Sequence, residues 1–246
     1  MDEMGREKQK RPCIIVCPGG GYRRCSQREA EVIGAHFLPE GYNVFVIYYS
    51  VAPHRFPQQL REIAALMELI YKNSEEWNCD TSKISLIGFS AGGHLAAHNC
   101  TMSDSNEVRQ AFPESKNVNA CILGYPVISA EPTVAHRGSF ENLLGLYPET
   151  EEEQKYFSCE CNVDENTPPT FIWHTAKDRC VPVQNSMLYA QALAAHDVPF
   201  ELHIFPFGGH GLATVDAQTN GTLESKVAHA GEWIGAVKKW LKIMQC

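Results

Sequence analysis

The sequence Lys83-Ile84-Ser85-Leu86-Ile87-Gly88-Phe89-Ser90-Ala91-Gly92-Gly93-His94-Leu95-Ala96-Ala97-His98 joins an apolar run to a helix-like run through the pentapeptide Gly-Phe-Ser-Ala-Gly. The first run predicts a buried strand over 83–89, and the second predicts the start of a helix at position 91. Ser90 then lies on a sharp strand-to-helix turn, which lifts its hydroxyl out of the sheet. Small residues flank it because bulky side chains would collide in so tight a bend. Ser90 is therefore a candidate nucleophile.

Apolar runs alternate with helical patterns along the rest of the chain. Strands are expected over 13–17, 43–49, 84–89, 120–125, 170–175 and 200–205, and helices over 27–38, 57–73, 91–100, 185–196 and 223–244. The strands are continuously apolar, which is typical of a parallel sheet covered by helices on both faces. We predict an α/β fold with a mainly parallel sheet of about six strands, whose carboxyl ends carry the functional residues.

Size and charge limit the range of functions. The 246 residues are 44% hydrophobic, which suits a single domain over 1–246. The formal net charge is −8 and the basic residues form no stripe, so nucleic acid is not an expected partner. No apolar run approaches the ~20 residues that span a bilayer, so no membrane partner is expected. The polar start over 1–11 lacks the apolar stretch of a signal peptide, which predicts a cytoplasmic protein.

The segment 129–169 fits the alternating pattern poorly. It is acidic at 149–153 and rich in proline at both ends, and long connections in compact domains usually have a function. We interpret it as a small cap-like insertion over the site, with short helices over 139–145 and 150–156. A surface insertion without a role is the alternative.

The ten cysteines and ten histidines do not form a metal-binding pattern. Most cysteines lie singly in apolar runs, where a free thiol acts as a small core residue, and free thiols are typical of a reducing cytoplasm. Cys159 and Cys161 lack a second pair, and His94 and His98 lack the glutamate of His-Glu-x-x-His. We therefore predict no metal and no organic cofactor.

A serine nucleophile requires a base and a carboxylate that orients the base. In a sheet of this type the order along the chain is Ser, then Asp or Glu, then His. Asp178 follows the expected strand over 170–175, and His210 lies in a glycine-rich loop after the strand over 200–205. Ser90, Asp178 and His210 are the predicted catalytic residues.

Other residues compete for these roles. Asp164 and Glu165 are alternatives for the carboxylate, but neither directly follows a strand, and Asp178 itself could be a turn-forming residue. His174 and His203 fall inside expected strands, which indicates packed and hydrogen-bonded core residues.

The glycine run after the first strand predicts donors for a developing oxyanion. Backbone N–H groups of Gly20, Gly21 and Ala91 would form this oxyanion hole, because glycine lets the backbone face the substrate directly. A plain turn is the alternative, and no phosphate-binding pattern follows the glycines. Side chains expected to shape the substrate pockets, or else to serve only in packing, are Tyr22, His54, Phe140 and Leu144.

Five motifs in chain order resemble the α/β-hydrolase esterases. They are Cys17-Pro18-Gly19-Gly20-Gly21-Tyr22, Tyr48-Tyr49-Ser50-Val51-Ala52-Pro53-His54-Arg55-Phe56-Pro57, Gly88-Phe89-Ser90-Ala91-Gly92-Gly93-His94-Leu95-Ala96, Asp178-Arg179-Cys180-Val181-Pro182-Val183 and Gly209-His210-Gly211-Leu212. The resemblance is to the acetyl-esterase and carbohydrate-deacetylase branch related to hormone-sensitive-lipase-like enzymes. It covers nearly the whole chain.

The chain departs from that pattern in two places. Pro18 stands where many lipase-like relatives have a histidine, so a neighbouring side chain must brace the glycine loop. Only about a dozen residues precede the first expected strand, so the antiparallel strands that usually open this fold are expected to be missing. An uncovered sheet edge would favour self-association, which makes a homo-oligomer a hypothesis.

The resemblance implies a serine carboxylesterase of short-chain acyl esters, with deacetylation of acetylated sugars as the expected reaction. The expected partner is a small acyl ester, and no cofactor is implied. An amidase such as an arylformamidase, or a small peptidase, would use the same residues. A hydrolase-like binding protein without turnover is the alternative from another class.

Overall fold

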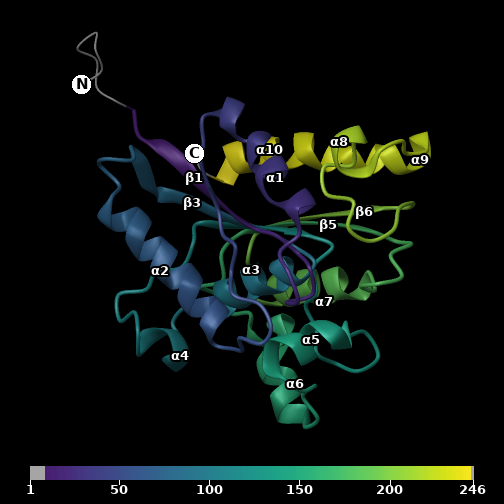
Figure 1. Cartoon of the computed structure of the whole chain (residues 1–246), viewed down its shortest axis with the longest axis horizontal. Coiled ribbons are helices and arrows are strands. Elements are labelled where there is room, and N and C mark those ends of the chain that lie inside the picture. The colour runs from purple at the N-terminus through teal and green to yellow at the C-terminus, as the bar shows by residue number, and fades with distance from the viewer. Residues whose placement is uncertain (1–8, 245–246) are drawn as a thin grey trace.

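The computed structural model describes residues 9–244, whose centre is a six-stranded, all-parallel sheet (Figure 1). The strands are β1 (Arg11–Cys17), β2 (Asn43–Val46), β3 (Cys79–Phe89), β4 (Ala120–Gly124), β5 (Thr170–Thr175) and β6 (Phe200–Phe205), and their order in the sheet is β2-β1-β3-β4-β5-β6. The predicted mainly parallel sheet of about six strands is confirmed. Among residues 9–244 every pairing in the sheet is parallel.

Helices cover both faces of the sheet. On one face lie α1 (Glu31–Ala35) and α10 (Glu232–Met244), and on the other lie α2 (Gln58–Lys72), α3 (Ala91–Met102) and α7 (Gln184–Ala195) (Figure 1). Short helical turns complete the chain: α4 (Asn106–Arg109), α8 (Ala217–Asn220), α9 (Ser225–Ala228), η1 (Gln27–Glu29), η2 (Leu38–Glu40) and η4 (His229–Gly231).

The side chains of β1 show why the strands are continuously apolar. Cys13 and Ile15 pack toward α2 and α3, whereas Ile14 and Val16 pack toward α1 and α10, and all four are fully buried. Successive side chains of a strand point to opposite faces, so a strand covered on both faces must be apolar throughout. The edge strands β2 and β6 are only half-buried along most of their length.

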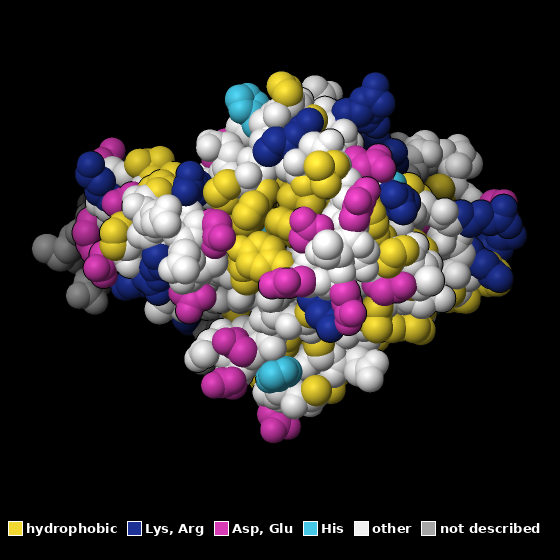
Figure 2. All heavy atoms as spheres, turned by 90° about the horizontal axis from the view of Figure 1, so that it is seen from below, with side chains coloured by type: hydrophobic (Ala, Val, Ile, Leu, Met, Phe, Trp, Pro, Cys, Tyr) yellow, Lys and Arg dark blue, Asp and Glu magenta, His cyan; other side chains and the backbone are white. Residues whose placement is uncertain are grey.

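The long connection between β4 and β5 contains α5 (Arg137–Leu144), α6 (Glu151–Phe157) and η3 (Cys159–Asn162). It lies beyond α3 and α7 on the side away from α10 (Figure 1). A capping box at Thr150 and Glu153 starts α6. Seen from this side, hydrophobic side chains gather near the middle of the face, with acidic side chains around them (Figure 2).

Two further features concern residues 9–244 as a whole. Within residues 9–244, no helix has both the length and the apolar character required to traverse a bilayer. The nine cysteines in this part of the chain carry free thiols, and six of them are buried.

Candidate active site

Ser90 occupies the turn between β3 and α3 with an unusual backbone conformation. Its φ is +54° and its ψ is −120°. The turn is held on both sides, because Ser90 N–H donates to Gly124 O at 3.0 Å and Ser90 O accepts from Val127 N at 3.0 Å. Non-glycine residues with positive φ are strained and concentrate at functional sites. Ser90 has the conformation that the strand-to-helix turn predicted.

The flanking glycines are required by space. A Cβ atom on Gly88 would lie 2.1 Å from Gly92 O, and a Cβ atom on Gly92 would lie 2.2 Å from Cys17 O. Both distances are far below contact range, so no other residue fits at either position without moving the backbone. The helix can therefore begin directly against β1.

The structure brings Ser90, His210 and Asp178 together. His210 Nε2 lies 2.8 Å from Ser90 Oγ, and His210 Nδ1 lies 2.6 Å from Asp178 Oδ2. The network assigns the proton of the neutral ring to Nδ1, which donates to the carboxylate, and leaves Nε2 to accept from the Ser90 hydroxyl. The three residues follow β3, β5 and β6, so the carboxyl ends of parallel strands position them at one edge of the sheet.

Asp178 is held as a carboxylate. Its Oδ1 accepts from Cys180 N at 2.8 Å and from Val181 N at 3.0 Å, and its Oδ2 also lies 3.2 Å from His174 Nε2. Burial alone would raise the pKa of Asp178, but the hydrogen bonds from His174 and His210 outweigh it and hold that pKa well below the usual range. The charge needed to orient His210 is therefore present at neutral pH. The contact with His174 was not predicted, since that residue was interpreted as part of the core.

The loop that carries His210 is anchored to the end of β5. Thr175 Oγ1 donates to Gly208 O at 3.0 Å and lies 3.3 Å from Gly209 O. The ring of Tyr125 packs edge-on against the His210 ring, with centroids 5.0 Å apart. These contacts fix the imidazole in its position between Ser90 and Asp178.

Candidate backbone donors lie in the same part of the molecule as Ser90. Gly20 and Gly21 adopt φ of +127° and +66°, and within residues 9–244 their N–H groups donate to no acceptor. Ala91 is the first residue of α3, where the N–H groups of a helix have no intrahelical partner. Gly20 and Gly21 border the same cavity as Ser90. N–H groups without an acceptor can stabilise an oxygen that becomes negative.

Side chains brace the glycine loop at three points. Tyr49 Oη donates to Pro18 O at 2.7 Å, Glu29 Oε2 accepts from Gly19 N at 3.0 Å, and Asn142 Nδ2 donates to Gly21 O at 2.8 Å. Because Pro18 stands where many relatives have a histidine, the sequence indicated that a neighbouring side chain must brace the glycine loop. The pattern alone did not indicate which residues, because they come from three different segments.

The cavity in front of Ser90 measures about 410 Å³. Gly20, Gly21 and His210 line it, and the insertion between β4 and β5 contributes His136, Gly138 and Asn142. The insertion thus borders the candidate site. Burial lowers the pKa of His136, and the neighbouring His210 acts in the same direction.

The four predicted substrate-contacting side chains do not border this cavity. Tyr22 and Phe140 are each only 1% exposed and belong to the core, Leu144 is half-buried against it, and His54 lies exposed on a loop. Tyr22 is held inward because its hydroxyl bonds to His94 Nδ1 at 2.9 Å. Backbone and polar side chains line the cavity in their place.

His94 and His98, which the sequence did not favour as a metal-binding pair, are both buried. Both ring nitrogens of His94 are hydrogen-bonded, Nδ1 to Tyr22 Oη and Nε2 to Phe157 O at 3.1 Å. Burial lowers the pKa of His94 to about 4. Within residues 9–244, no cluster of three or more His, Cys, Asp or Glu side chains is suited to hold a metal ion.

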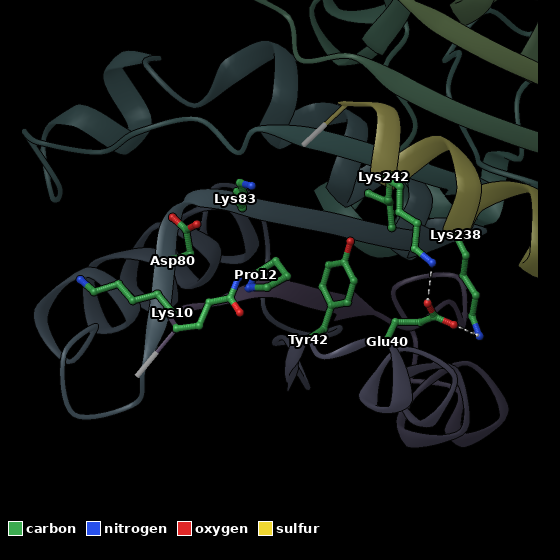
Figure 3. A pocket seen from close by; sticks show the side chains of 10 residues that line it. Lys10, Pro12, Glu40, Tyr42, Asp80, Lys83, Lys238 and Lys242 are labelled. Carbon is green, nitrogen blue, oxygen red and sulfur yellow. Dashed lines mark ion pairs between the residues drawn. The ribbon is translucent and has the colours of Figure 1, made fainter. Parts of the chain in front are cut away.

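A larger cavity of about 590 Å³ lies at the opposite edge of the sheet, near the starts of β1 and β3 (Figure 3). Glu40 forms ion pairs there with Lys238 at 3.2 Å and Lys242 at 3.1 Å. The chemistry of parallel sheets gathers at the carboxyl ends of the strands, so the smaller cavity beside Ser90 is the candidate active site.

Comparisons with known proteins give consistent matches. The sequence model of the BD-FAE family matches residues 3–193. The chain is 40% identical over 221 residues to endo-1,4-beta-xylanase B of Butyrivibrio fibrisolvens, covering 84% of this chain and 33% of that protein. It is 30% identical over 202 residues to the acetylxylan esterase of Xylanibacter ruminicola, covering 80% of this chain and 40% of that protein. The chain therefore spans a third to two fifths of the length of these two relatives.

A solved structure is similar over almost the whole chain. The acetyl ester-xyloside bifunctional hydrolase of Caldicellulosiruptor lactoaceticus superimposes with a TM-score of 0.84 at 39% identity, covering 97% of this chain and 85% of that one. These matches confirm the predicted resemblance to α/β-hydrolase esterases and the predicted class of hydrolases.

Proposed function

Because the chain belongs to the BD-FAE family, we propose that it is a serine carboxylesterase that hydrolyses short-chain acyl esters and removes acetyl groups from acetylated sugars. One observation carries this proposal: the unbroken contact from Ser90 Oγ through His210 to the Asp178 carboxylate. That order of groups is what a hydroxyl requires to act as a nucleophile near neutral pH.

The proposed reaction has two halves. Ser90 Oγ attacks the ester carbonyl while its proton moves to His210 Nε2, and the same proton then passes to the leaving alcohol as the carbon–oxygen bond breaks. Water attacks the acyl-enzyme with His210 as base, and Ser90 regains a proton as the carboxylic acid leaves. Asp178 keeps the ring oriented and stabilises the imidazolium.

The N–H groups of Gly20, Gly21 and Ala91 would stabilise the oxyanion of both tetrahedral intermediates. Such a donor is worth about 10²–10³ in turnover when it is aimed at the developing charge. The side chains that hold the glycine loop in place are therefore as important for turnover as the glycines themselves, because a misplaced donor stabilises the oxyanion little.

The substrate class is supported by the relatives and by the cavity. Two of the similar proteins carry the names acetylxylan esterase and acetyl ester-xyloside bifunctional hydrolase. A cavity of about 410 Å³ lined by glycine and polar side chains suits a small acyl group and a polar alcohol. The nine free thiols among residues 9–244 support a cytoplasmic location, and the half-buried edge strands leave self-association as a hypothesis.

A covalent fluorophosphonate probe and a panel of esters test the proposal. We expect the probe to label the wild type and not Ser90→Ala, and we expect the same substitution to lower the hydrolysis of 4-nitrophenyl acetate by at least about 10⁴-fold. Ser82→Ala, which alters an exposed serine on β3, should retain both activities. Release of acetate from acetylated xylo-oligosaccharides tests the sugar substrate.

Two outcomes would contradict the proposal. A folded wild type that is not labelled would indicate a binding protein without turnover. Labelling at Ser90 together with faster cleavage of amides than of matched esters would favour an amidase or peptidase on the same residues.

A further inference from the structure

We infer that the cavity in front of Ser90 selects esters whose alcohol portion carries a carboxylate, and that Arg23 and Arg24 bind this carboxylate. The substrate class is thus an acetylated acidic sugar, such as one containing a uronic acid. The inference rests on the proposed esterase function and adds to it the charge of the substrate.

The two arginines are held next to the proposed oxyanion donors. The N–H groups of Arg23 and Arg24 donate to Gly20 O at 3.1 and 3.3 Å. A Cβ atom on Gly20 would lie 2.1 Å from Arg24 O, so the turn is too tight for any other residue at that position. Both side chains start from this fixed turn and border the cavity that contains Ser90 and His210.

Neither guanidinium has a partner among residues 9–244. Arg23 and Arg24 are exposed, and within residues 9–244 their side chains form no hydrogen bond or ion pair. Arg28 also borders the cavity, but its guanidinium donates to Thr219 O, to Gly211 O at 3.0 Å and to the Asn220 side chain at 2.6 Å. Those acceptors are neutral, so the charge of Arg28 adds to the field of the free pair.

The cavity is cationic in a protein that is acidic as a whole. The chain has a formal net charge of −8, yet three arginines and one glutamate line this cavity. That glutamate, Glu29, is 4% exposed, and its two oxygens already accept from Gly19 N and from Tyr125 Oη. An anion that enters the cavity therefore meets positive charge, and a recessed site focuses such a field.

The chemistry of guanidinium specifies the ligand. Arginine presents planar, paired N–H groups that match the two oxygens of a carboxylate. The acyl group expected here is acetyl, which carries no charge once it is esterified. The carboxylate must therefore belong to the alcohol portion of the ester, and a sugar whose terminal carbon is a carboxylate is a uronic acid.

A matched pair of esters tests the inference. The value of kcat/KM is measured at pH 7 for 4-acetoxybenzoate, which is anionic, and for its neutral methyl ester, and the ratio of the two values is compared among variants. In the double variant Arg23→Gln, Arg24→Gln we expect this ratio to fall about tenfold. The substitutions remove charge-assisted hydrogen bonds that are partly exposed, and the loss of such contacts has about this effect. Hydrolysis of the neutral ester should stay within about twofold, since exposed charges contribute little to an uncharged ligand.

Arg109→Gln is the matched control. It removes one positive charge from α4, where the guanidinium donates to Pro113 O and does not border the cavity. We expect it to leave the ratio unchanged. In the wild type, 0.5 M NaCl should lower the ratio because salt screens exposed charges, and in the double variant it should have little effect.

Each remaining outcome would overturn the inference. An unchanged ratio in the double variant, with the neutral ester still hydrolysed, would refute the carboxylate site and leave the esterase function standing. An equal fall in Arg109→Gln would show general attraction to the protein and not a site. Hydrolysis of neither ester by the folded wild type would refute the esterase function and this inference together.

Discussion

Glu29 joins two loops of the candidate site through one buried carboxylate. Its Oε2 accepts from Gly19 N at 3.0 Å, and its Oε1 accepts from Tyr125 Oη at 2.6 Å. Tyr125 Oη in turn accepts from Ala213 N at 2.9 Å, three residues beyond His210. The glycine loop and the histidine loop are therefore held by a single network, and Glu29 is a positioning residue for the proposed reaction.

We predict that Glu29→Gln lowers kcat for 4-nitrophenyl acetate about 10- to 100-fold with KM changed by less than about threefold, because oxyanion donors act mainly in the transition state. A glutamine offers one acceptor oxygen, so it cannot accept from both Gly19 and Tyr125. Steady-state kinetics give the two constants, and the inhibition constant of a boronic acid should weaken in parallel with kcat.

Tyr125→Phe separates this positioning role from packing. It keeps the ring against His210 and removes only the hydroxyl, so kcat should fall in the same direction with a similar melting temperature. If Glu29→Gln loses stability but keeps the wild-type kcat, the network serves only the fold.

The spacing of single residues was sufficient to predict which serine, carboxylate and histidine meet in the candidate site. Ser90, Asp178 and His210 each follow an apolar strand, and the order along the chain restricts the choice among competitors. Glu29 and His174 could not be found this way, because their contacts join segments far apart in the sequence. Glu29 lay in an expected helix over 27–38, where a glutamate normally faces water.

At the scale of elements, α5 connects the insertion to the glycine loop. Asn142 on α5 donates from Nδ2 to Gly21 O at 2.8 Å, and Asn142 O accepts from Arg55 Nη1 at 2.5 Å. The helix is thus tied both to the loop of proposed oxyanion donors and to the segment before α2. Movement of α5 would be transmitted to Gly21.

We predict that Asn142→Ala lowers kcat about tenfold, because Gly21 loses the hydrogen bond that fixes its peptide and a misplaced donor stabilises the oxyanion less well. Asn162→Ala is the control within the same insertion, since its amide donates to Lys155 O, Tyr156 O and Ser158 O and not to the loop. Equal effects of the two substitutions on kcat would show that the insertion acts through its overall stability and not through Gly21.

The elements were predictable where burial is continuous. The strands over 170–175 and 200–205 match β5 and β6 at both ends. The expected strand over 43–49 ends earlier, at Val46, because Tyr48 and Tyr49 leave the sheet to bond to Glu31 and Pro18. Such departures depend on distant partners, which periodicity does not reveal.

The expected helices over 27–38 and 223–244 are both broken. The first divides into η1, α1 and η2, and the second into α9, η4 and α10. In the first, Gly34 packs so closely on β2 that a Cβ atom would lie 2.6 Å from Val44. Tertiary packing of this kind overrides the helical pattern, and it can be recognised only once the sheet is known.

At the scale of the whole molecule, His94 links the core to the insertion. Its neutral ring accepts from Tyr22 Oη and donates to Phe157 O, and it packs edge-on against Phe140 at 5.2 Å. Burial lowers the pKa of His94 to about 4, and the hydrogen bond to Phe157 only partly offsets this effect. Burial also lowers the pKa of the neighbouring His98. Both rings are therefore neutral in the folded protein at pH 7.

The sign of the resulting pH dependence follows from the two states of His94. The pH range that matters runs from 6.5, the ordinary pKa of histidine, down to about 4, the pKa of His94 in the folded protein. As the pH falls through this range, the unfolded chain binds a proton at His94 that the folded protein does not bind, so the free energy of unfolding decreases. The His94 contribution is complete above pH 6.5 and amounts to about 2 kcal/mol between pH 7 and pH 5. For a chain of this size we expect the melting temperature to fall by about 4–8 °C over that interval from His94 alone.

Thermal unfolding at pH 7, 6 and 5 measures this fall in melting temperature. His94→Gln should flatten the slope, whereas His196→Gln, at the exposed end of α7, should not. Equal slopes in the wild type and His94→Gln would show that other groups control the acid sensitivity.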